Sequence, residues 1–364
     1  MLQAADKVDV VHFVTGGFSG ATMVARQLVA AANNHSGGKQ HLLVLRKKRQ
    51  TQASQLQELS AQQIPYLLVP GWSHLATIFS LILILKRLNP RVLIAHGFSE
   101  HLWGRLAAVL AGVPVIIHVE HNSKERYTFF RLWLAKQLAK RTRWIVGVSE
   151  GVCNELIRLG FPREKCTFVN NGIDMEIYKQ LPLPEFSARK NAVIMCARFA
   201  RQKDHATLIK AIAHLKDRGE VVELALLGGG KTSIKQRMIK LCAQLGVAEQ
   251  VHFLGHSNQV PQLLAQHKIA ALITHYEGMP LALVEAMAAG CAVVASQVVG
   301  VQELLALGLG TAVKPGDADH LANQISFLFN NPKIAAESAQ KSQHYALKHF
   351  TLSNMLAGYN TLIE

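Results

Sequence analysis

Residues Thr274 to Gly290 read THYEGMPLALVEAMAAG, and an apolar, β-branched run precedes them. Gly278 and Pro280 interrupt any helix through the first half of this stretch, whereas the second half is apolar at helical spacing. The pattern predicts a buried strand, a short loop and a helix that starts near Leu281. A strand, a loop and a helix form the repeating unit of a parallel α/β sheet.

The same alternation extends over the whole chain of 364 residues. Short β-branched runs recur between segments of helical length. The first series comprises Val8–Val14, His41–Leu45, Val92–Ala95, Val115–His118 and Trp144–Val148. The second series comprises Val193–Ala197, Val222–Leu227, Val251–Phe253, Ile269–Thr274 and Ala292–Ala295. We therefore expect an α/β protein with two Rossmann-like, doubly wound parallel sheets.

Two prolines separate the two series. Pro182 and Pro184 interrupt both periodicities and predict a polar, extended connector that can act as a hinge. We expect one domain over residues 1–180 and a second over residues 188–346. Ligands of open parallel sheets bind at the carboxyl ends of the strands, so the two sheets are expected to face each other across a central cleft.

The composition is that of a globular protein. Hydrophobic residues make up 49% of the chain and charged residues 17%, which suits two full cores. The cysteines form no C-x-x-C pair, which argues against a disulfide framework and a zinc site. Residues 1–10 lack the basic start and long apolar stretch of a signal peptide, so we expect a cytoplasmic protein. The apolar run Leu75–Leu85 is too short to span a bilayer and predicts a buried helix.

Basic residues are concentrated in the first half of the chain. The net charge is +15, and residues 1–180 hold 22 Lys and Arg against 11 Asp and Glu. Within this half, Lys124–Arg143 combines seven basic residues with Phe, Trp and Leu. This segment is suited to an anionic membrane surface, and equally to a core helix with a solvated basic face. A non-catalytic module that binds membrane or nucleic acid is therefore an alternative to an enzyme.

Two carboxylates, Glu277 and Glu285, lie on the predicted loop and on the predicted helix, and not on one helical face. A carboxylate accepts hydrogen bonds from two hydroxyls, so Glu277 suits a sugar and Glu285 a ribose. Backbone amides at the helix N-terminus suit phosphate oxygens. The residues of this turn are Gly278, Met279, Pro280 and Leu281. The alternative is that the two carboxylates act as a general acid and base on a scissile bond.

A pair of cations lies at another predicted helix start. Arg198 ends a strand-like run, and Lys203 precedes a helix that Asp204 can cap. Two cations in this position can neutralise a diphosphate without a metal. Asp317 and Asp319 form a D-x-D sequence, but an apolar helix follows them, so we expect capping and not metal binding.

The first predicted strand is followed by Gly16 and Gly17. Glycines let backbone amides approach a phosphate or an acceptor, although the spacing is not that of a dinucleotide site. Two histidines, His96 and His121, also follow strand-like runs. Both are therefore candidates for the cleft.

Taken together, these segments resemble the retaining family 4 glycosyltransferases (glycosyl transferases group 1), which have the two-domain GT-B fold. The likeness rests on the Glu, seven residues, Glu motif that starts at Glu277, on Arg198 with Lys203, and on the Gly-Gly loop. It implies transfer of a hexose-type sugar from a nucleotide diphosphate sugar to a glycan or lipid-linked acceptor. It also implies retention at the anomeric carbon, no metal, no tightly bound cofactor and no nucleic acid.

The resemblance also implies a role for each residue. The catalytic residues it implies are Glu277, His121, Arg198 and Lys203, with His121 near the anomeric centre. The donor-binding residues it implies are Gly16, Gly17, Gly228, Gly278, Met279, Pro280, Leu281 and Glu285. The first domain would bind the acceptor, and a last helix, residues 347–364, would pack back on it.

The resemblance and the basic first half together imply a role in the biosynthesis of a surface polysaccharide. The expected process is synthesis of lipopolysaccharide or another surface polysaccharide, on the inner face of the cytoplasmic membrane. A nucleotide-sugar epimerase or a phosphorylase of related fold is the alternative enzyme.

Overall fold

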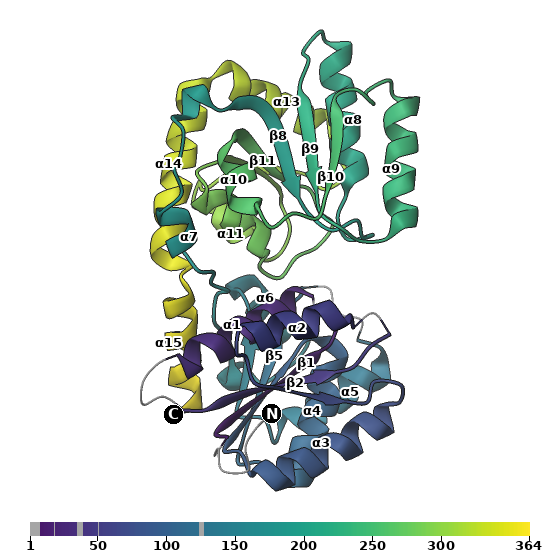
Figure 1. Ribbon diagram of the computed structural model, residues 1–364, viewed down its shortest axis with the longest axis vertical. Helices are drawn as coiled ribbons and strands as arrows, with labels where there is room; N and C mark the ends of the chain where they lie inside the picture. The colour runs from purple at the N-terminus through teal and green to yellow at the C-terminus, as the bar shows by residue number, and fades with distance from the viewer. Residues whose placement is uncertain (1–7, 18, 35–38, 50, 124–126) are drawn as a thin grey trace. The chain divides into compact units, whose positions relative to one another are not determined.

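The computed structural model describes residues 8–17, 19–34, 39–49, 51–123 and 127–364. These residues form two compact units, each built on one parallel sheet (Figure 1). Unit 1 comprises the residues up to Gly172 together with Leu352–Glu364, and unit 2 comprises Ile173–Thr351. The predicted α/β class with two doubly wound parallel sheets is confirmed.

The described sheet of unit 1 has the strand order β3-β2-β1-β4-β5-β6-β7. Its strands are β1 (Val10–Thr15), β2 (His41–Arg46), β3 (Tyr66–Val69), β4 (Val92–His96), β5 (Val115–Glu120), β6 (Trp144–Gly147) and β7 (Cys166–Phe168). Its helices are α1 (Gly20–Asn33), α2 (Ala53–Ala61), α3 (His74–Leu88), α4 (Phe98–Ala111), α5 (Phe129–Ala139), α6 (Glu150–Arg158) and α15 (Leu352–Ile363). The order reverses between β1 and β4, whose carboxyl ends mark the switch point.

The sheet of unit 2 has the strand order β10-β9-β8-β11-β12-β13. Its strands are β8 (Lys190–Cys196), β9 (Glu223–Leu227), β10 (Val251–Gly255), β11 (His267–Leu272), β12 (Ala292–Ser296) and β13 (Thr311–Val313). Its helices are α7 (Glu176–Lys179), α8 (His205–Asp217), α9 (Thr232–Gln244), α10 (Val260–Ala265), α11 (Leu281–Ala288), α12 (Gln302–Ala306), α13 (Ala318–Asn330) and α14 (Pro332–His349). Here the switch point lies between β8 and β11.

Strand alternation decides which helices cover each face of the sheet in unit 1. Val11 and Phe13 pack with buried residues of α3 and α4, whereas Val14 and Leu43 pack with buried residues of α1. Figure 1 shows α3 and α4 on one side of this sheet and α1 on the other. Successive side chains of a strand point to opposite faces, so both faces of β1 are buried, and the face with Val14 also carries the buried His12. Burial of each such side chain contributes roughly 1.5–3 kcal/mol to stability.

The boundary between the units differs from the one that the prolines indicated. Residues 173–180 belong to unit 2, because the Ile173 amide donates to the Phe350 carbonyl at 2.9 Å and Tyr178 is buried. Burial and the nearby charge of Glu285 raise the pKa of Tyr178. In contrast, α15 belongs to unit 1, where Met355 Sδ accepts from the Gly172 amide at 3.3 Å.

Helix α3 is not the buried helix that the sequence indicated. Leu81 and Leu85 are buried, but Leu75, Phe79 and Leu83 are 79%, 65% and 53% exposed. The apolar run encodes two faces, and only one of them meets the sheet. None of the helices in the described part of the chain has the length and apolar character needed to cross a bilayer.

Candidate functional site

The predicted charged residues Arg198, Lys203 and Glu277 lie on the two loops that follow β8 and β11, at the switch point of unit 2. The two loops pair through their backbones, with a β-bridge between Lys203 and Thr274. The His275 amide donates to the Gln202 carbonyl at 3.0 Å, and the Gln202 side chain donates to the Tyr276 carbonyl at 2.7 Å. These bonds join the two loops into one platform. Sequence reasoning did not identify Gln202 or Thr274 as parts of it.

Lys203 and Glu277 form an ion pair on this platform. Lys203 Nζ lies 2.5 Å from Glu277 Oε1, and the Thr274 hydroxyl donates to the same oxygen at 2.9 Å. The two charged side chains are only 11% and 8% exposed. Within the described residues Glu277 Oε2 accepts no hydrogen bond. The pair is therefore held rigidly and keeps one carboxylate oxygen available.

Arg198 lies on the same platform, directly after β8. It is exposed, and its guanidinium makes no hydrogen bond or ion pair to any residue that the structure describes. Asp204 caps α8 as predicted, because its Oδ1 accepts from the Thr207 amide at 3.2 Å. Asp317 likewise caps α13, with a 2.9 Å bond from the His320 amide, so the capping interpretation of the D-x-D sequence is confirmed.

Glycines bring the neighbouring loops into contact. A Cβ at Gly228 would lie 2.3 Å from the Ala197 carbonyl oxygen, and the Gly228 amide donates to the Gly255 carbonyl at 2.7 Å. A Cβ at Gly300 would lie 1.6 Å from the carbonyl oxygen of Gly278. Glycine at 228 and 300 therefore permits close backbone packing around the platform.

The turn before α11 exposes helix-start amides. Pro280 is the N-cap and α11 begins at Leu281, as predicted. The Leu281 and Ala282 amides have no acceptor among the described residues. The first amides of a helix lack intrahelical partners and attract anions. Met279, by contrast, directs its side chain into the core and is only 6% exposed.

Glu285 lies on α11 and is half-buried. None of the side chains that the structure describes donates a hydrogen bond to its carboxylate. Burial alone raises the pKa of Glu285 from 4.5 to about 7. A carboxylate in this state gains from any ligand that donates hydroxyl groups to it.

We expect Glu285→Gln to raise the melting temperature more at pH 8 than at pH 5. The folded-state pKa of about 7 exceeds the unfolded value, so Glu285 binds more protons in the folded state and stability falls as the pH rises through this pKa. Gln has the same shape and stays neutral at every pH. Thermal unfolding at pH 5, 6, 7 and 8 measures the difference. Glu337→Gln, at an exposed position of α14, is the control. Equal shifts at all pH values would contradict the raised pKa.

The predicted residues of unit 1 lie in two places. Gly16 and Gly17 follow β1, and their amides donate to the Arg46 carbonyl at 2.8 Å and to Thr15 Oγ1 at 3.3 Å. A Cβ at Gly16 would lie 2.7 Å from the Arg46 carbonyl oxygen, so glycine at 16 serves close packing of two loops. Phe18, in the same loop, lies outside the described residues.

His121 follows β5 and ends a row of four imidazoles. Its Nε2 lies 3.1 Å from His96 Nδ1, His96 Nε2 lies 3.0 Å from His12 Nδ1, and His12 Nε2 lies 2.9 Å from His41 Nδ1. Burial lowers the pKa of every ring, to about 3 for His121 and about 4 for His41. All four rings are therefore neutral. Sequence reasoning singled out His96 and His121 but did not identify His12 or His41.

One buried cluster has the composition of a metal site. Ligand atoms of His101, His118 and Glu120 lie within 4.8 Å of one another, and no other group in the described part of the chain does so. The two imidazoles are stacked with centroids 3.9 Å apart, so their nitrogens cannot both point at one ion in the ring planes. In addition, the Arg105 guanidinium donates to His101 Nδ1 at 2.9 Å. The cluster fits a buried polar network better than a metal centre.

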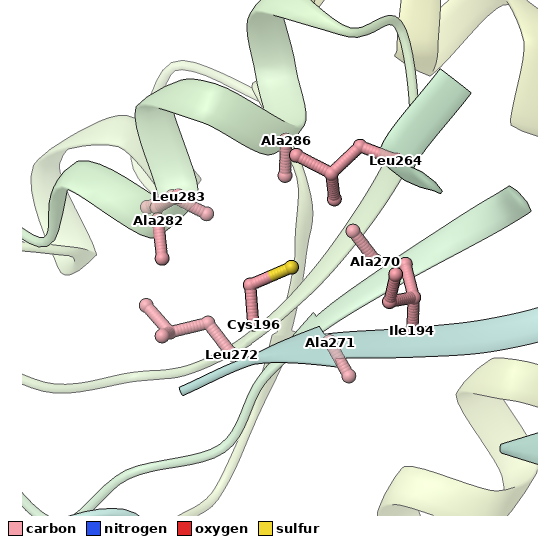
Figure 2. A pocket seen from close by; sticks show the side chains of 9 residues that line it. All are labelled: Ile194, Cys196, Leu264, Ala270, Ala271, Leu272, Ala282, Leu283 and Ala286. Atoms are coloured by element: carbon pink, nitrogen blue, oxygen red, sulfur yellow. The ribbon is translucent and has the colours of Figure 1, made fainter. Parts of the chain in front are cut away.

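A small cavity lies between α11 and the sheet of unit 2 (Figure 2). Its lining is apolar except for the sulfur of Cys196, and its free volume is about 10 Å³. That is about the space of one water molecule, and an apolar void of this kind stays dry. The cavity is a packing gap and not a ligand site.

Exposed apolar side chains gather at the starts of α3 and α5. Trp72, Leu75 and Phe129 are 84%, 79% and 91% exposed. Burial and the nearby cations Arg46, Lys48 and Arg131 lower the pKa of His74 at the start of α3. Residues 124–126 of the basic segment lie outside the described residues.

Basic side chains lie beside these apolar ones. A pocket of about 590 Å³ adjoins Trp72, and its lining includes Lys47, Lys48 and Arg49. We use the name apolar-basic face for the basic side chains after β2 together with the exposed apolar side chains of α3 and α5. Its members are Lys47, Lys48, Arg49, Trp72, Leu75, Phe79, Phe129, Phe130 and Trp133. Phe130 and Trp133 are 62% and 50% exposed, so the aromatic residues of α5 are not core residues.

Comparison with known proteins covers both units. The family described as Glycosyltransferase Family 4 matches residues 18–177, and the family described as Glycosyl transferases group 1 matches residues 182–348. Among solved structures, that of Anabaena HepE in complex with UDP-glucose is 22% identical, with a TM-score of 0.85 over 97% of this chain and 99% of that one. This likeness shows a shared fold.

Curated relatives are similar over part of their length. The N-acetylgalactosamine-N,N'-diacetylbacillosaminyl-diphospho-undecaprenol 4-alpha-N-acetylgalactosaminyltransferase of Campylobacter jejuni is 28% identical over 58% of this chain. The UDP-Gal:alpha-D-GlcNAc-diphosphoundecaprenol alpha-1,3-galactosyltransferase of Escherichia coli is 22% identical over 62% of this chain. The chain spans 55% and 62% of these two relatives.

Proposed function

Because the chain belongs to the GT-B glycosyltransferases, with a family 4 domain over residues 18–177 and a group 1 domain over residues 182–348, we propose that it transfers a hexose-type sugar from a nucleotide diphosphate sugar to a glycan or lipid-linked acceptor. The observation that carries this proposal is the Lys203 and Glu277 ion pair at the switch point of unit 2. Beside it lie the exposed Arg198 and the amides that start α11.

Each group on the platform has a chemistry that suits one part of such a donor. Arg198, Lys203 and the first amides of α11 are donors for diphosphate oxygens. Glu277 Oε2 can accept from a sugar hydroxyl while Oε1 stays bonded to Lys203. Glu285 can accept from the two ribose hydroxyls.

The proposed reaction proceeds with retention and without a metal. As the bond to the departing diphosphate breaks, negative charge grows on its oxygens, and the fixed cations and amides stabilise this charge. The acceptor hydroxyl attacks from the face that the diphosphate leaves, and His121 stabilises the positive charge on the anomeric carbon. Glu277 orients the sugar, which lowers the entropic part of the barrier.

A panel of UDP-, GDP- and ADP-sugars in a thermal-shift assay tests the donor part of this proposal. A true donor raises the melting temperature by mass action. Product NMR then determines the anomeric configuration, with and without EDTA. Donor epimerised without any acceptor would indicate an epimerase, and transfer that requires inorganic phosphate would indicate a phosphorylase. If no nucleotide sugar stabilises the protein, the proposal fails.

We also propose that the apolar-basic face rests on an anionic membrane that carries the acceptor. Its basic side chains suit anionic headgroups, and its exposed aromatic side chains suit the bilayer interface. The relatives named above act on diphospho-undecaprenol-linked sugars. An acceptor of this class suits synthesis of lipopolysaccharide or another surface polysaccharide on the inner face of the cytoplasmic membrane.

Replacement of Trp72 and Phe129 by Ser should weaken binding to vesicles that contain anionic lipid by about 10²-fold or more, because each exposed ring contributes roughly 1.5–3 kcal/mol when it is buried in the interface. Flotation with neutral and anionic vesicles, at low and high salt, measures the effect. The matched control replaces Val221 and Ile334, which are 76% and 48% exposed in unit 2. Equal binding by both double variants would refute the membrane contact. RNA binding that tracks the same residues would favour a nucleic-acid module.

A further inference from the structure

The four-histidine row of unit 1 follows from the register of its strands. His41 pairs with the residue two before His12, His12 with the residue two before His96, and His96 with the residue two before His121. Paired residues of parallel strands share a face, and so do residues two apart on one strand. The four rings therefore lie on one face of the sheet, in a diagonal line from the amino end of β2 to the carboxyl end of β5.

The line is a continuous hydrogen-bond chain. The three nitrogen-to-nitrogen distances are 2.9, 3.0 and 3.1 Å. A neutral imidazole carries one N–H and one lone pair. In His12 and His96 both nitrogens are engaged in the chain, so a ring that accepts on one side must donate on the other. All contacts therefore point the same way, and the tautomer at one end determines the tautomer at the other.

We propose that His41, His12, His96 and His121 form a proton relay that removes the proton of the acceptor hydroxyl during transfer. This role rests on the proposed glycosyltransferase function. His121 acts as the base through Nδ1, the one ring nitrogen that it does not use in the chain. His41, His12 and His96 are positioning residues, because they act through His121.

The proton balance closes over one turnover. His121 Nδ1 takes a proton and passes its Nε2 proton to His96 Nδ1. His96 passes its Nε2 proton to His12 Nδ1, and His12 passes its Nε2 proton to His41 Nδ1. His41 then releases its Nε2 proton to water. Between turnovers, water returns a proton to His41 and accepts one from His121 Nδ1, which restores the tautomers.

The surroundings favour neutral rings along the chain. Burial is the main cause of the lowered pKa of each ring. At His41, Lys39 lowers the pKa further, while Asp9 raises it. At His121, the backbone amide donates to Glu120 Oε1 at 3.0 Å, which holds the loop after β5 in place.

Nitrogen NMR of the full-length protein with labelled histidines tests the hydrogen-bond chain of the four rings, and this measurement does not require sugar transfer. We expect couplings across the three N–H···N contacts, and a changed tautomer at His121 in both His41→Phe and His12→Gln. The matched control is His252→Phe, at an exposed position of β10. If both variants fold and leave the His121 tautomer unchanged, the relay is refuted. If the tautomers are coupled but the protein has no transferase activity, the proposed function is refuted, whereas the hydrogen-bond chain of the four histidines is not.

Kinetics test the proton transfer itself. Gln at position 12 can form hydrogen bonds but cannot pass a proton along them. We expect His12→Gln to lower kcat by about 10²-fold, the scale of general base catalysis, with the donor KM within twofold of its original value. In H2O and D2O mixtures, the dependence of kcat on deuterium fraction should be curved in the unaltered protein and linear in the variant. If the tautomers are coupled but His12→Gln leaves kcat and its isotope dependence unchanged, proton transfer along the four histidines is refuted.

Discussion

Lys203→Ala is expected to lower the free energy of unfolding by about 3 kcal/mol and to lower kcat/KM about 10²–10³-fold. The stability loss arises because Glu277, which is 8% exposed, would keep a buried charge without its cation. The activity loss arises because the departing diphosphate would lose one of its two proposed side-chain cations. Urea unfolding and steady-state kinetics with the identified donor measure the two effects.

Removal of both partners distinguishes pairing from general disruption. The double variant Lys203→Ala, Glu277→Ala should be more stable than Lys203→Ala alone, because no unpaired charge remains buried. Lys210→Ala, at an exposed position of α8, is the matched control and should change neither stability nor activity. A double variant less stable than Lys203→Ala would mean that the ion pair is not what holds the two loops.

Gly300→Ala is expected to cost about 3 kcal/mol of stability and to raise the donor KM at least tenfold. The added Cβ would lie 1.6 Å from the Gly278 carbonyl oxygen, a distance that no rotamer change can relieve. The turn before α11 would have to move, and with it the helix-start amides. Chemical denaturation and donor titration report the two losses separately.

Gly316→Ala is a matched control for this substitution. Gly316 has φ +80° and Gly300 has φ +81°, so both replacements carry the same backbone strain. No heavy atom lies within 4 Å of the Cβ position at Gly316, so only the strain of about 1 kcal/mol should appear. Similar losses in both variants would show that strain, and not the contact with Gly278, makes glycine necessary at position 300.

The central strands and the edge strand β10 could be predicted from the sequence, whereas the other three edge strands could not. All ten runs of β-branched residues correspond to strands of the structure, because buried parallel strands are continuously apolar. The predictions missed β3, β7 and β13. Each lies at or next to an edge of its sheet, is only 3–4 residues long, and is partly exposed. A strand with one neighbour needs little apolar surface, so its composition carries little signal.

The segments that form the platform could be predicted from the sequence, but the contacts that join them could not. The α11 start, the Asp204 cap and the placement of Glu277 before that helix follow from local rules for glycine, proline and capping residues. The bond between Lys203 and Glu277 joins residues 74 positions apart and depends on the pairing of β8 with β11. Local rules contain no information about that pairing.

The same limit explains the errors in unit 1. The apolar run of α3 indicated burial, but a helix presents only one face to a sheet, and the exposed face with Leu75 and Phe79 depends on what packs beside it. The four histidines lie far apart in the chain, and only strand register places their nitrogens 2.9–3.1 Å apart.

The sequence by itself determined the fold class, the two-sheet organisation and the residue types of the donor platform, because hydrophobic period, turn residues and caps act over a few neighbouring residues. Only the tertiary structure decided which of these residues touch. It joined Lys203 to Glu277, pressed Gly300 against Gly278 and aligned His41 with His121. The physical reason is that strand pairing sets these contacts, and register is a property of the assembled sheet.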